Sequence, residues 1–226
     1  ADLEIIETEL LLRDIESLEK RLNKVEKLAR SGDKSAKQES VVLQKMIAVV
    51  NKGKQVRNIE LEKNESKFIK SLSLLTEKPV LYAANVDETE ITSETRSEMI
   101  QRLFNHASKN GSEAIRLCGK LEMEISTMPK GDRGDFLMEY GMAGPGLEKL
   151  IHSAYKLLGL ETFFTASPKE VRARTVPTGT SAPKAAGSIH SDFERGFIKA
   201  EVYTYESLMK YKSENALKDV GKIRQE

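Results

Sequence analysis

Apolar residues near the start of the chain recur at the spacing expected of a helix that packs against a second helix. The spacing is that of a heptad seam. Intervals of four, three, four and three residues separate its members Leu11, Ile15, Leu18, Leu22 and Val25. Ser31-Gly32-Asp33 interrupts the pattern, and Gly32 suits a helix C-terminal cap. A second helical pattern over residues 35–50 follows, so the two together predict an antiparallel coiled-coil hairpin.

An apolar run in the middle of the chain predicts a buried strand. The run Pro79-Val80-Leu81-Tyr82-Ala83-Ala84-Asn85 consists largely of small and apolar residues, which is typical of a parallel strand. We expect a short helix over residues 66–75 before it, with N-cap residues between Asn64 and Ser66. A helix over residues 93–109 and a second strand from Ala114 follow. Strand, helix and strand form a crossover unit, which brings the two strand ends side by side.

Polar residues at these two strand ends predict a ligand site. In open α/β sheets, ligands bind at the carboxyl ends of the strands. The Asn85 amide can donate to a purine ring nitrogen, and the Glu88 carboxylate can accept from a purine N–H. The second strand ends at Cys118-Gly119-Lys120, where small residues let the backbone approach a base closely. In the alternative interpretation Asn85 caps local backbone in a polar turn. Asp87, adjacent to Glu88, is expected to point to solvent.

The last part of the chain alternates short strand and helix patterns. Strands are expected over residues 161–167, 169–176 and 196–202, with a break at Ser167-Pro168 between the first two. Short helices are expected over residues 135–140, 146–158, 184–187, 205–211 and 214–220. A hairpin followed by a helix and a strand suits a small β-grasp module.

The chain resembles the YchF/Ola-type branch of the Obg-related P-loop NTPases. The resemblance rests on Asn85-Val86-Asp87-Glu88, on Cys118-Gly119-Lys120, and on a long C-terminal stretch that includes residues 160–166, 169–173 and 185–202. It implies an α/β fold, in which a partial P-loop NTPase domain carries an inserted coiled-coil arm and is followed by a ubiquitin-like β-grasp (TGS) domain. The implied ranges are 1–78 for the arm and its flanking helices, 79–159 for the C-terminal half of the nucleotide-binding domain, and 160–226 for the TGS domain.

The resemblance also implies roles for the strand-end residues. The implied nucleotide-binding residues are Asn85, Val86, Glu88, Cys118, Gly119 and Lys120. Val86 stands where related GTPases carry Lys, and either touches the base or simply packs. Glu88 stands where GTP-specific relatives use Asp, whose short carboxylate accepts from two guanine N–H groups. The longer Glu disturbs that geometry, which implies a preference for ATP over GTP. Cys118 is expected to be a small buried residue rather than a redox nucleophile.

The chain lacks the pattern that the family uses to hold phosphates. Gly-x-x-x-x-Gly-Lys-Ser/Thr does not occur in these 226 residues. We therefore expect a fragment that holds the base-recognition half of a site, with no catalytic residue and no metal ligand of its own. The Mg²⁺ ligands of the complete protein would lie outside it, and the chain alone would not hydrolyse nucleotide. The family's TGS domain implies another strand after Glu226.

Composition narrows the partners and the compartment. A formal net charge of +1 gives no global electrostatic argument for nucleic-acid binding. A basic cluster of Lys169, Arg172, Arg174 and Lys184 is either a solvated face or a contact for ribosomal RNA phosphates. A single cysteine favours the reducing cytoplasm, and no stretch reaches the roughly 20 apolar residues that span a bilayer. The rival function is a non-enzymatic module that binds a ribosome or another protein through the arm and the TGS domain. The oligomeric state stays open.

Overall fold

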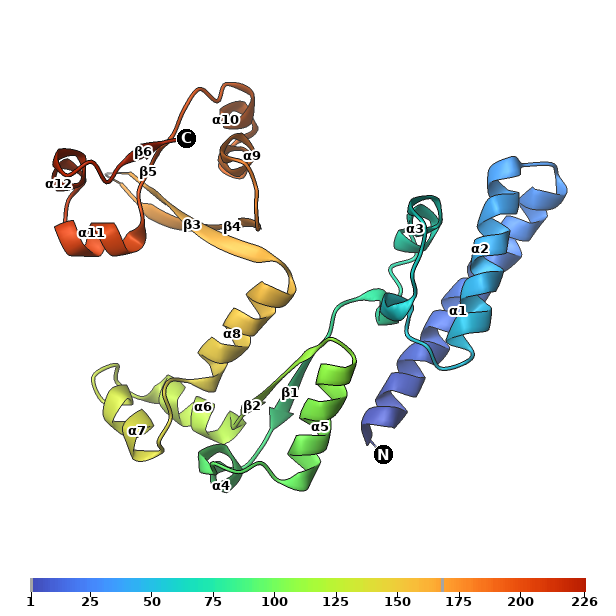
Figure 1. Ribbon diagram of the computed structural model, residues 1–226, viewed down its shortest axis with the longest axis horizontal. Coiled ribbons are helices and arrows are strands. Elements are labelled where there is room, and N and C mark those ends of the chain that lie inside the picture. Colours follow the sequence, from blue (N-terminus) through green and yellow to red (C-terminus); the bar gives the residue numbers. More distant parts are fainter. Residues whose placement is uncertain (1, 168) are drawn as a thin grey trace. The chain divides into compact units, whose positions relative to one another are not determined.

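The structure is a computed structural model that describes residues 2–167 and 169–226. Ala1, the first residue of the predicted arm, and Pro168, part of the predicted break, lie outside the described residues. The chain divides into two compact units, residues 1–124 and residues 125–226 (Figure 1). This division does not coincide with the predicted domain ends at 78 and 159, so those domain ranges stay predictions.

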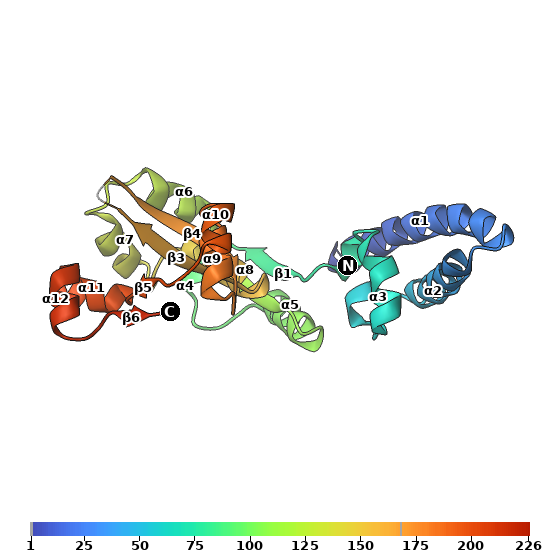
Figure 2. The same ribbon diagram turned by 90° about the horizontal axis from the view of Figure 1, so that it is seen from above.

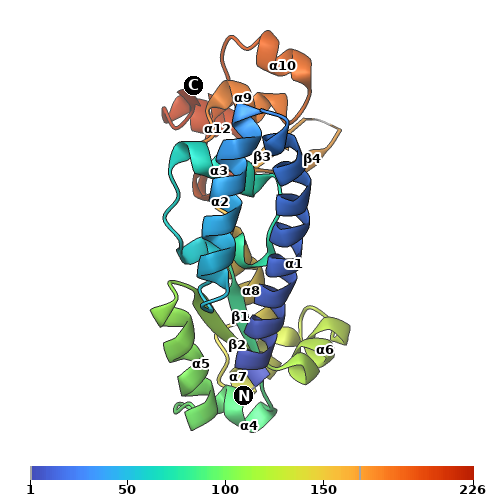
Figure 3. The same ribbon diagram turned by 90° about the vertical axis from the view of Figure 1, so that its right-hand side faces the viewer.

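Two helices form a hairpin at the start of the first unit. They are α1 (Asp2–Arg30) and α2 (Lys34–Val50), which lie side by side in Figure 3. Gly32 turns the chain with a φ of +100°, a conformation that favours glycine, and the Asp33 carboxylate accepts from the Ala36 N–H as the N-cap of α2. Fully buried side chains of the hairpin include Leu18, Val25, Leu43, Met46 and Val50. The two predicted helices are therefore confirmed.

The segment between the hairpin and the first strand differs from the prediction. It holds η1 (Val56–Asn58), α3 (Lys63–Lys70) and η2 (Leu75–Glu77). The predicted helix over 66–75 was wrong at both ends. Glu62 and Glu65 form a capping box that starts α3 earlier than the expected Asn64–Ser66 cap. After Lys70 the chain turns through Ser73, whose φ is +52°, and this ends the helix.

Two parallel strands follow, and they position the candidate site. The strands β1 (Leu81–Asn85) and β2 (Glu113–Leu117) pair in parallel from Leu81↔Glu113 to Asn85↔Leu117, which confirms the predicted crossover. Helix α5 (Glu98–Lys109) packs on both strands. Only Ala84 of β1 is buried, so the prediction of a fully buried strand was wrong, because the side chains of Ala83 and Asn85 are exposed.

Short helices follow directly after both strands. They are α4 (Glu88–Thr92) and α6 (Gly119–Thr127), and neither was predicted. The helix expected over 93–109 begins only at Glu98, because α4 ends at Thr92 and the residues between them form a loop. The Ser97 N–H, just before α5, donates to the Glu90 carboxylate at 2.9 Å, which ties this loop to α4.

The second unit is a mixture of short helices and two-stranded sheets (Figure 2). Its elements are α7 (Arg133–Glu139), α8 (Gly146–Leu157), β3 (Leu160–Ala166), β4 (Val171–Pro177), α9 (Ala182–Gly187), α10 (Ser191–Arg195), β5 (Glu201–Val202), α11 (Tyr205–Tyr211), α12 (Glu214–Asp219) and β6 (Arg224–Gln225). Strands β3 and β4 form an antiparallel hairpin, and β5 and β6 form an antiparallel pair. The whole is a mixed α/β fold.

Two features of the second unit differ from the prediction. The strand expected over residues 196–202 is only Glu201–Val202, because its partner β6 offers two residues for pairing. Helix α10 ends at Arg195, just before the expected strand. The ring Nδ1 of His190 caps this helix by accepting from the Asp192 N–H. The short strand β6 was not predicted, and the strand that the resemblance implies after Glu226 stays a prediction. Among the helices that the structure describes, none is long and apolar enough to cross a membrane.

Candidate functional site

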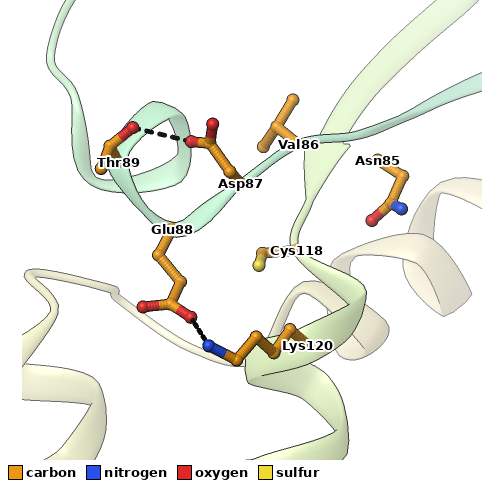
Figure 4. A pocket seen from close by; sticks show the side chains of 7 residues that line it. All are labelled: Asn85, Val86, Asp87, Glu88, Thr89, Cys118 and Lys120. Atoms are coloured by element: carbon orange, nitrogen blue, oxygen red, sulfur yellow. Dashed lines mark hydrogen bonds and ion pairs between the residues drawn. The ribbon is translucent and has the colours of Figure 1, made fainter.

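A recess lies at the carboxyl ends of β1 and β2 (Figure 4). Its volume is about 470 Å³. Its lining comes from the end of β1, the start of α4, and the turn from β2 into α6: Asn85, Val86, Asp87, Glu88, Thr89, Cys118 and Lys120. The parallel register brings the two strand ends together, as the sequence predicted. Five of the six predicted nucleotide-binding residues line this recess, and the sixth, Gly119, contacts Asn85.

Asn85 is fixed by the backbone of the neighbouring strand end. Its side-chain Oδ1 accepts from the Gly119 N–H at 3.0 Å, and the next residue, Val86, donates its N–H to the Leu117 carbonyl at 2.9 Å. A Cβ on Gly119 would lie 3.3 Å from the Asn85 Oδ1, so the close approach favours glycine. The amide oxygen of Asn85 caps local backbone, and the amide nitrogen is its remaining hydrogen-bonding group.

Asp87 organises the loop that carries Glu88. Its carboxylate accepts from the Glu90 N–H and from the Thr89 hydroxyl, both at 2.8 Å, and these bonds lower the pKa of Asp87. Asp87 is exposed, as expected, but it is also the N-cap of α4. Sequence reasoning missed this role, although an Asp three residues before Glu90 is a recognisable start signal for a helix.

Glu88 and Lys120 form an ion pair at the mouth of the recess. The Lys120 Nζ lies 2.6 Å from the Glu88 Oε1, and Figure 4 shows the two side chains pointing toward each other. The Glu88 side chain is 34% exposed and that of Lys120 is 71% exposed. Glu88 also sits in the first turn of α4, where the helix dipole favours a negative charge. The pair therefore presents one free carboxylate oxygen beside an ammonium group.

Comparisons with known proteins find relatives that match the whole chain. The family model YchF-GTPase_C, described as a protein of unknown function (DUF933), matches residues 160–226. The ribosome-binding ATPase YchF of Escherichia coli O157:H7 is 40% identical over 225 residues, which cover 100% of this chain and 61% of that protein. Its Bacillus subtilis counterpart is 42% identical, with 62% of its length covered. The structure of the Schizosaccharomyces pombe YchF GTPase matches with a TM-score of 0.82 and 31% identity, over 100% of this chain and 61% of that one.

This chain belongs to the YchF family. It spans about three-fifths of the curated relatives that it matches, and the structural match covers the same share, 61%. The match of the family model over residues 160–226 agrees with the C-terminal stretch that carried most of the resemblance.

Within this YchF family chain, the structure distinguishes the remaining candidate residues. Cys118 is 3% exposed, which supports a packing role. Of the predicted RNA-binding residues, Arg172 pairs with Glu170 at 2.8 Å, and Arg174 donates to the Ser188 carbonyl at 3.0 Å. Lys169 lies in the turn between β3 and β4, and Lys184 lies on α9. Both guanidinium groups of the proposed cluster thus have partners inside the chain.

The sequence did not reveal a polar cluster that includes Tyr82, which lies three residues before Asn85 on β1. The Tyr82 hydroxyl donates to the Glu7 carboxylate at 3.0 Å, and the His106 Nε2 lies 2.9 Å from the same oxygen. Burial alone would raise the pKa of Glu7, but the hydrogen bonds from His106 and Tyr82 outweigh it and lower that pKa. Burial and the Glu7 carboxylate raise the pKa of Tyr82. The cluster joins α1 to β1 and α5.

Proposed function

We propose that this chain carries the base-recognition part of a nucleotide-binding YchF protein that prefers ATP over GTP and contacts the ribosome. The observation that carries the proposal is the recess, where Asn85 and the Glu88–Lys120 pair meet at the ends of two parallel strands. The names of the relatives support both parts, since they read ribosome-binding ATPase and GTPase. In this proposal the hairpin α1–α2 is the inserted coiled-coil arm, the second unit contains the TGS β-grasp domain, and the protein works beside ribosomes in the cytoplasm.

The preference for ATP follows from the hydrogen-bonding groups at the mouth of the recess. Guanine offers two adjacent N–H donors, and a carboxylate matches both only with two available oxygens. Lys120 already donates to Oε1 of Glu88, so that oxygen is a poorer acceptor for the second guanine donor. Adenine offers a single amino group and an acceptor ring nitrogen on the same edge. The amino group can donate to the second carboxylate oxygen of Glu88, and the ring nitrogen can accept from an N–H donor of the site. Adenine needs only one carboxylate oxygen, so its hydrogen bond is not weakened by the contact with Lys120.

Neither phosphate nor Mg²⁺ chemistry is assigned to these residues. In the part of the chain that the structure describes, no three His, Cys, Asp or Glu side chains gather in a way that could hold a metal ion. The sequence has no Gly-x-x-x-x-Gly-Lys-Ser/Thr loop. We therefore propose that hydrolysis belongs to the complete YchF protein, where Mg²⁺ would neutralise phosphate charge, and that this chain alone does not turn over nucleotide.

Calorimetric titration of the chain with ATP, GTP and CTP, each with Mg²⁺, tests the proposal. Saturable binding with the order ATP, then GTP, then no detectable CTP would support it. Equal binding of CTP would refute base recognition, because a pyrimidine does not offer the same edge. ATP turnover by the purified chain that disappears in Asn85→Ala would refute the assignment of hydrolysis to the complete protein.

A second candidate function is a non-enzymatic module that docks on a ribosome or another protein, with nucleotide only gating the contact. The hydrophobic core that the hairpin shares with Val56, Ile69 and Leu74 favours it, because an arm held by such a core can present a binding surface. Co-sedimentation with ribosomes, with and without ATP at low and high salt, separates the two. Binding that ignores ATP altogether would favour the docking module.

A further inference from the structure

Charge is unevenly distributed along the helical hairpin. From Asp2 to Glu19, α1 carries one cation, Arg13, against seven acids: Asp2, Glu4, Glu7, Glu9, Asp14, Glu16 and Glu19. The hairpin tip, which we define as residues 24–37, reverses this balance. It holds two acids, Glu26 and Asp33, against five cations: Lys24, Lys27, Arg30, Lys34 and Lys37. The formal net charge of the whole chain is only +1, so the tip is a local concentration of positive charge.

The five tip cations are exposed, and none forms an ion pair within the part of the chain that the structure describes. The two tip acids have other tasks. The Asp33 carboxylate caps α2, and the Glu26 carboxylate accepts from the Gln44 amide at 3.3 Å. Arg21, just outside the tip, is held by Glu39 at 2.6 Å. Five cations against two acids leave the tip with a formal net charge of +3, and its cations face solvent without ion-pair partners among the described residues.

Helix stability does not explain this arrangement. Lys27 and Arg30 lie in the last turn of α1, where the helix dipole favours cations. Lys34 and Lys37 lie at the start of α2, where the same dipole favours acids, and its first turn has none. Exposed helical charges form ion pairs at other places in the chain, as in Arg13–Glu16 and Glu98–Arg102. The like charges at the start of α2 cost stability, so a binding role accounts for them better.

The tip is a rigid end with the chemistry of a phosphate contact. Val25 and Ala36 are buried beneath it, 1% and 6% exposed, and the two helices are joined only by residues 31–33. The tip has no Phe, Tyr or Trp, so it offers nothing on which a base could stack. Lysine is a point charge that suits phosphate oxygens. A membrane-surface helix would need an aromatic and aliphatic face, and Leu28 is the only large hydrophobic that the tip exposes among its described residues.

We infer that the hairpin tip binds the phosphate backbone of structured RNA without reading its sequence. The inference rests on the proposed ribosome contact and names the surface that makes it. It also moves the main contact away from the predicted cluster in the second unit, where Arg172 and Arg174 already have partners within the chain. The tip would supply most of the salt dependence of ribosome binding, because releasing counterions from phosphates drives such binding.

The test compares binding of the full chain to purified ribosomes and to a protein-free RNA duplex between 50 and 200 mM salt. The tip variant changes Lys24, Lys27, Lys34 and Lys37 to Gln. A matched control changes four exposed lysines of the same unit to Gln: Lys52, Lys54, Lys63 and Lys70. A second tip variant with Arg at the same four positions keeps the charge, and circular dichroism establishes that every variant folds.

The inference predicts that the Gln tip variant lowers the slope of log affinity against log salt by about 3 to 4, since each phosphate contact contributes about 0.9. Affinity at low salt falls by at least about tenfold, while the control and the Arg variant keep the wild-type slope. Wild-type binding with an unchanged slope in the Gln tip variant would overturn the inference and leave the proposed ribosome contact intact. No wild-type binding to ribosomes or RNA would overturn the ribosome contact itself. Tip-dependent binding to ribosomes but not to RNA would identify an acidic protein as the partner instead.

Discussion

Replacing Asp14 should destabilise the junction between the helical hairpin and the strand that carries Asn85. Asp14 lies on α1, and its side chain is buried, with 1% of the residue exposed. Its carboxylate accepts from the Leu75 N–H at 2.7 Å, the Thr76 N–H at 2.8 Å and the Thr76 hydroxyl at 2.7 Å. These bonds fix η2, which leads directly into β1.

The magnitude follows from this geometry. Asp14→Ala removes three hydrogen bonds to a charged acceptor, each contributing about 1.5–3 kcal/mol. It also leaves two backbone N–H groups without an acceptor, at a cost of about 1–3 kcal/mol each if water cannot reach them. The cost per hydrogen bond and the cost per unsatisfied N–H group describe the loss of the same interactions, so they are not added together. Two unsatisfied buried N–H groups together cost about 2–6 kcal/mol, and we expect a decrease of that size in the free energy of unfolding.

Urea unfolding followed by far-ultraviolet circular dichroism measures this change. Because the chain has two compact units, the transition of the first unit is assigned by hydrogen exchange of the buried Leu43 and Met46 amides. Asp14→Asn, which keeps one acceptor oxygen, should fall between wild type and Asp14→Ala. Glu9→Ala, an exposed change on the same helix, should stay within about 0.5 kcal/mol. A loss below about 1 kcal/mol in Asp14→Ala would show that these three hydrogen bonds do not stabilise the junction as described.

Three further predictions concern the site and its support. Lys120→Met should raise the affinity for GTP relative to ATP, because it releases the Glu88 oxygen that Lys120 contacts. Competition with a fluorescent nucleotide measures the ratio of the two affinities. An unchanged ratio would count against the ion pair as a determinant of base preference. Gly119→Ala should weaken ATP binding several-fold in the same assay with little loss of stability, because its Cβ would crowd the Asn85 oxygen at 3.3 Å; wild-type affinity would show that this approach is not needed. Glu7 has a lower pKa in the folded chain than its ordinary value of 4.5, so its carboxylate stabilises the fold above that pH, and this contribution is lost as pH falls through the folded-state pKa. Urea unfolding should therefore show Glu7→Gln less stable than wild type at pH 7, with the gap closing toward pH 3; a gap independent of pH would contradict this.

The sequence predicted the elements whose signal is periodic. The seam from Leu11 to Val25 is long enough to define α1, and the apolar run before Asn85 located β1 to within two residues. The short helix α4 escaped prediction because its Asp87 cap, rather than periodicity, marks its start, and α6 begins within the segment that was expected to be a strand end. The strand expected over residues 196–202 shows the opposite error, because an apolar pattern predicted more strand than forms. Ile198 is apolar but 89% exposed, and only Glu201 and Val202 have pairing partners in β6.

The residues of the candidate site could be found from the sequence, but their interactions could not. Strand ends point to Asn85 and to Gly119 once the crossover is recognised. The Glu88–Lys120 ion pair joins residues 32 positions apart, and no local pattern reports such a pair. The Asp14 contact with Thr76 spans 62 positions for the same reason. Side-chain geometry between distant segments becomes visible only when the fold places them together.

Titration of the chain with ATP, followed by amide NMR, tests purine recognition at the recess, because it detects weak binding and locates it. If the recess binds the base, saturable shifts appear at the amides of residues 85–89 and 118–120, and they are larger with ATP than with GTP and absent with CTP. The same shifts should disappear in Asn85→Ala, while amides of the hairpin tip remain unchanged when magnesium and ionic strength are held constant. Shifts confined to other residues, or none at ATP concentrations up to the millimolar range, would contradict the claim that this recess recognises a purine base.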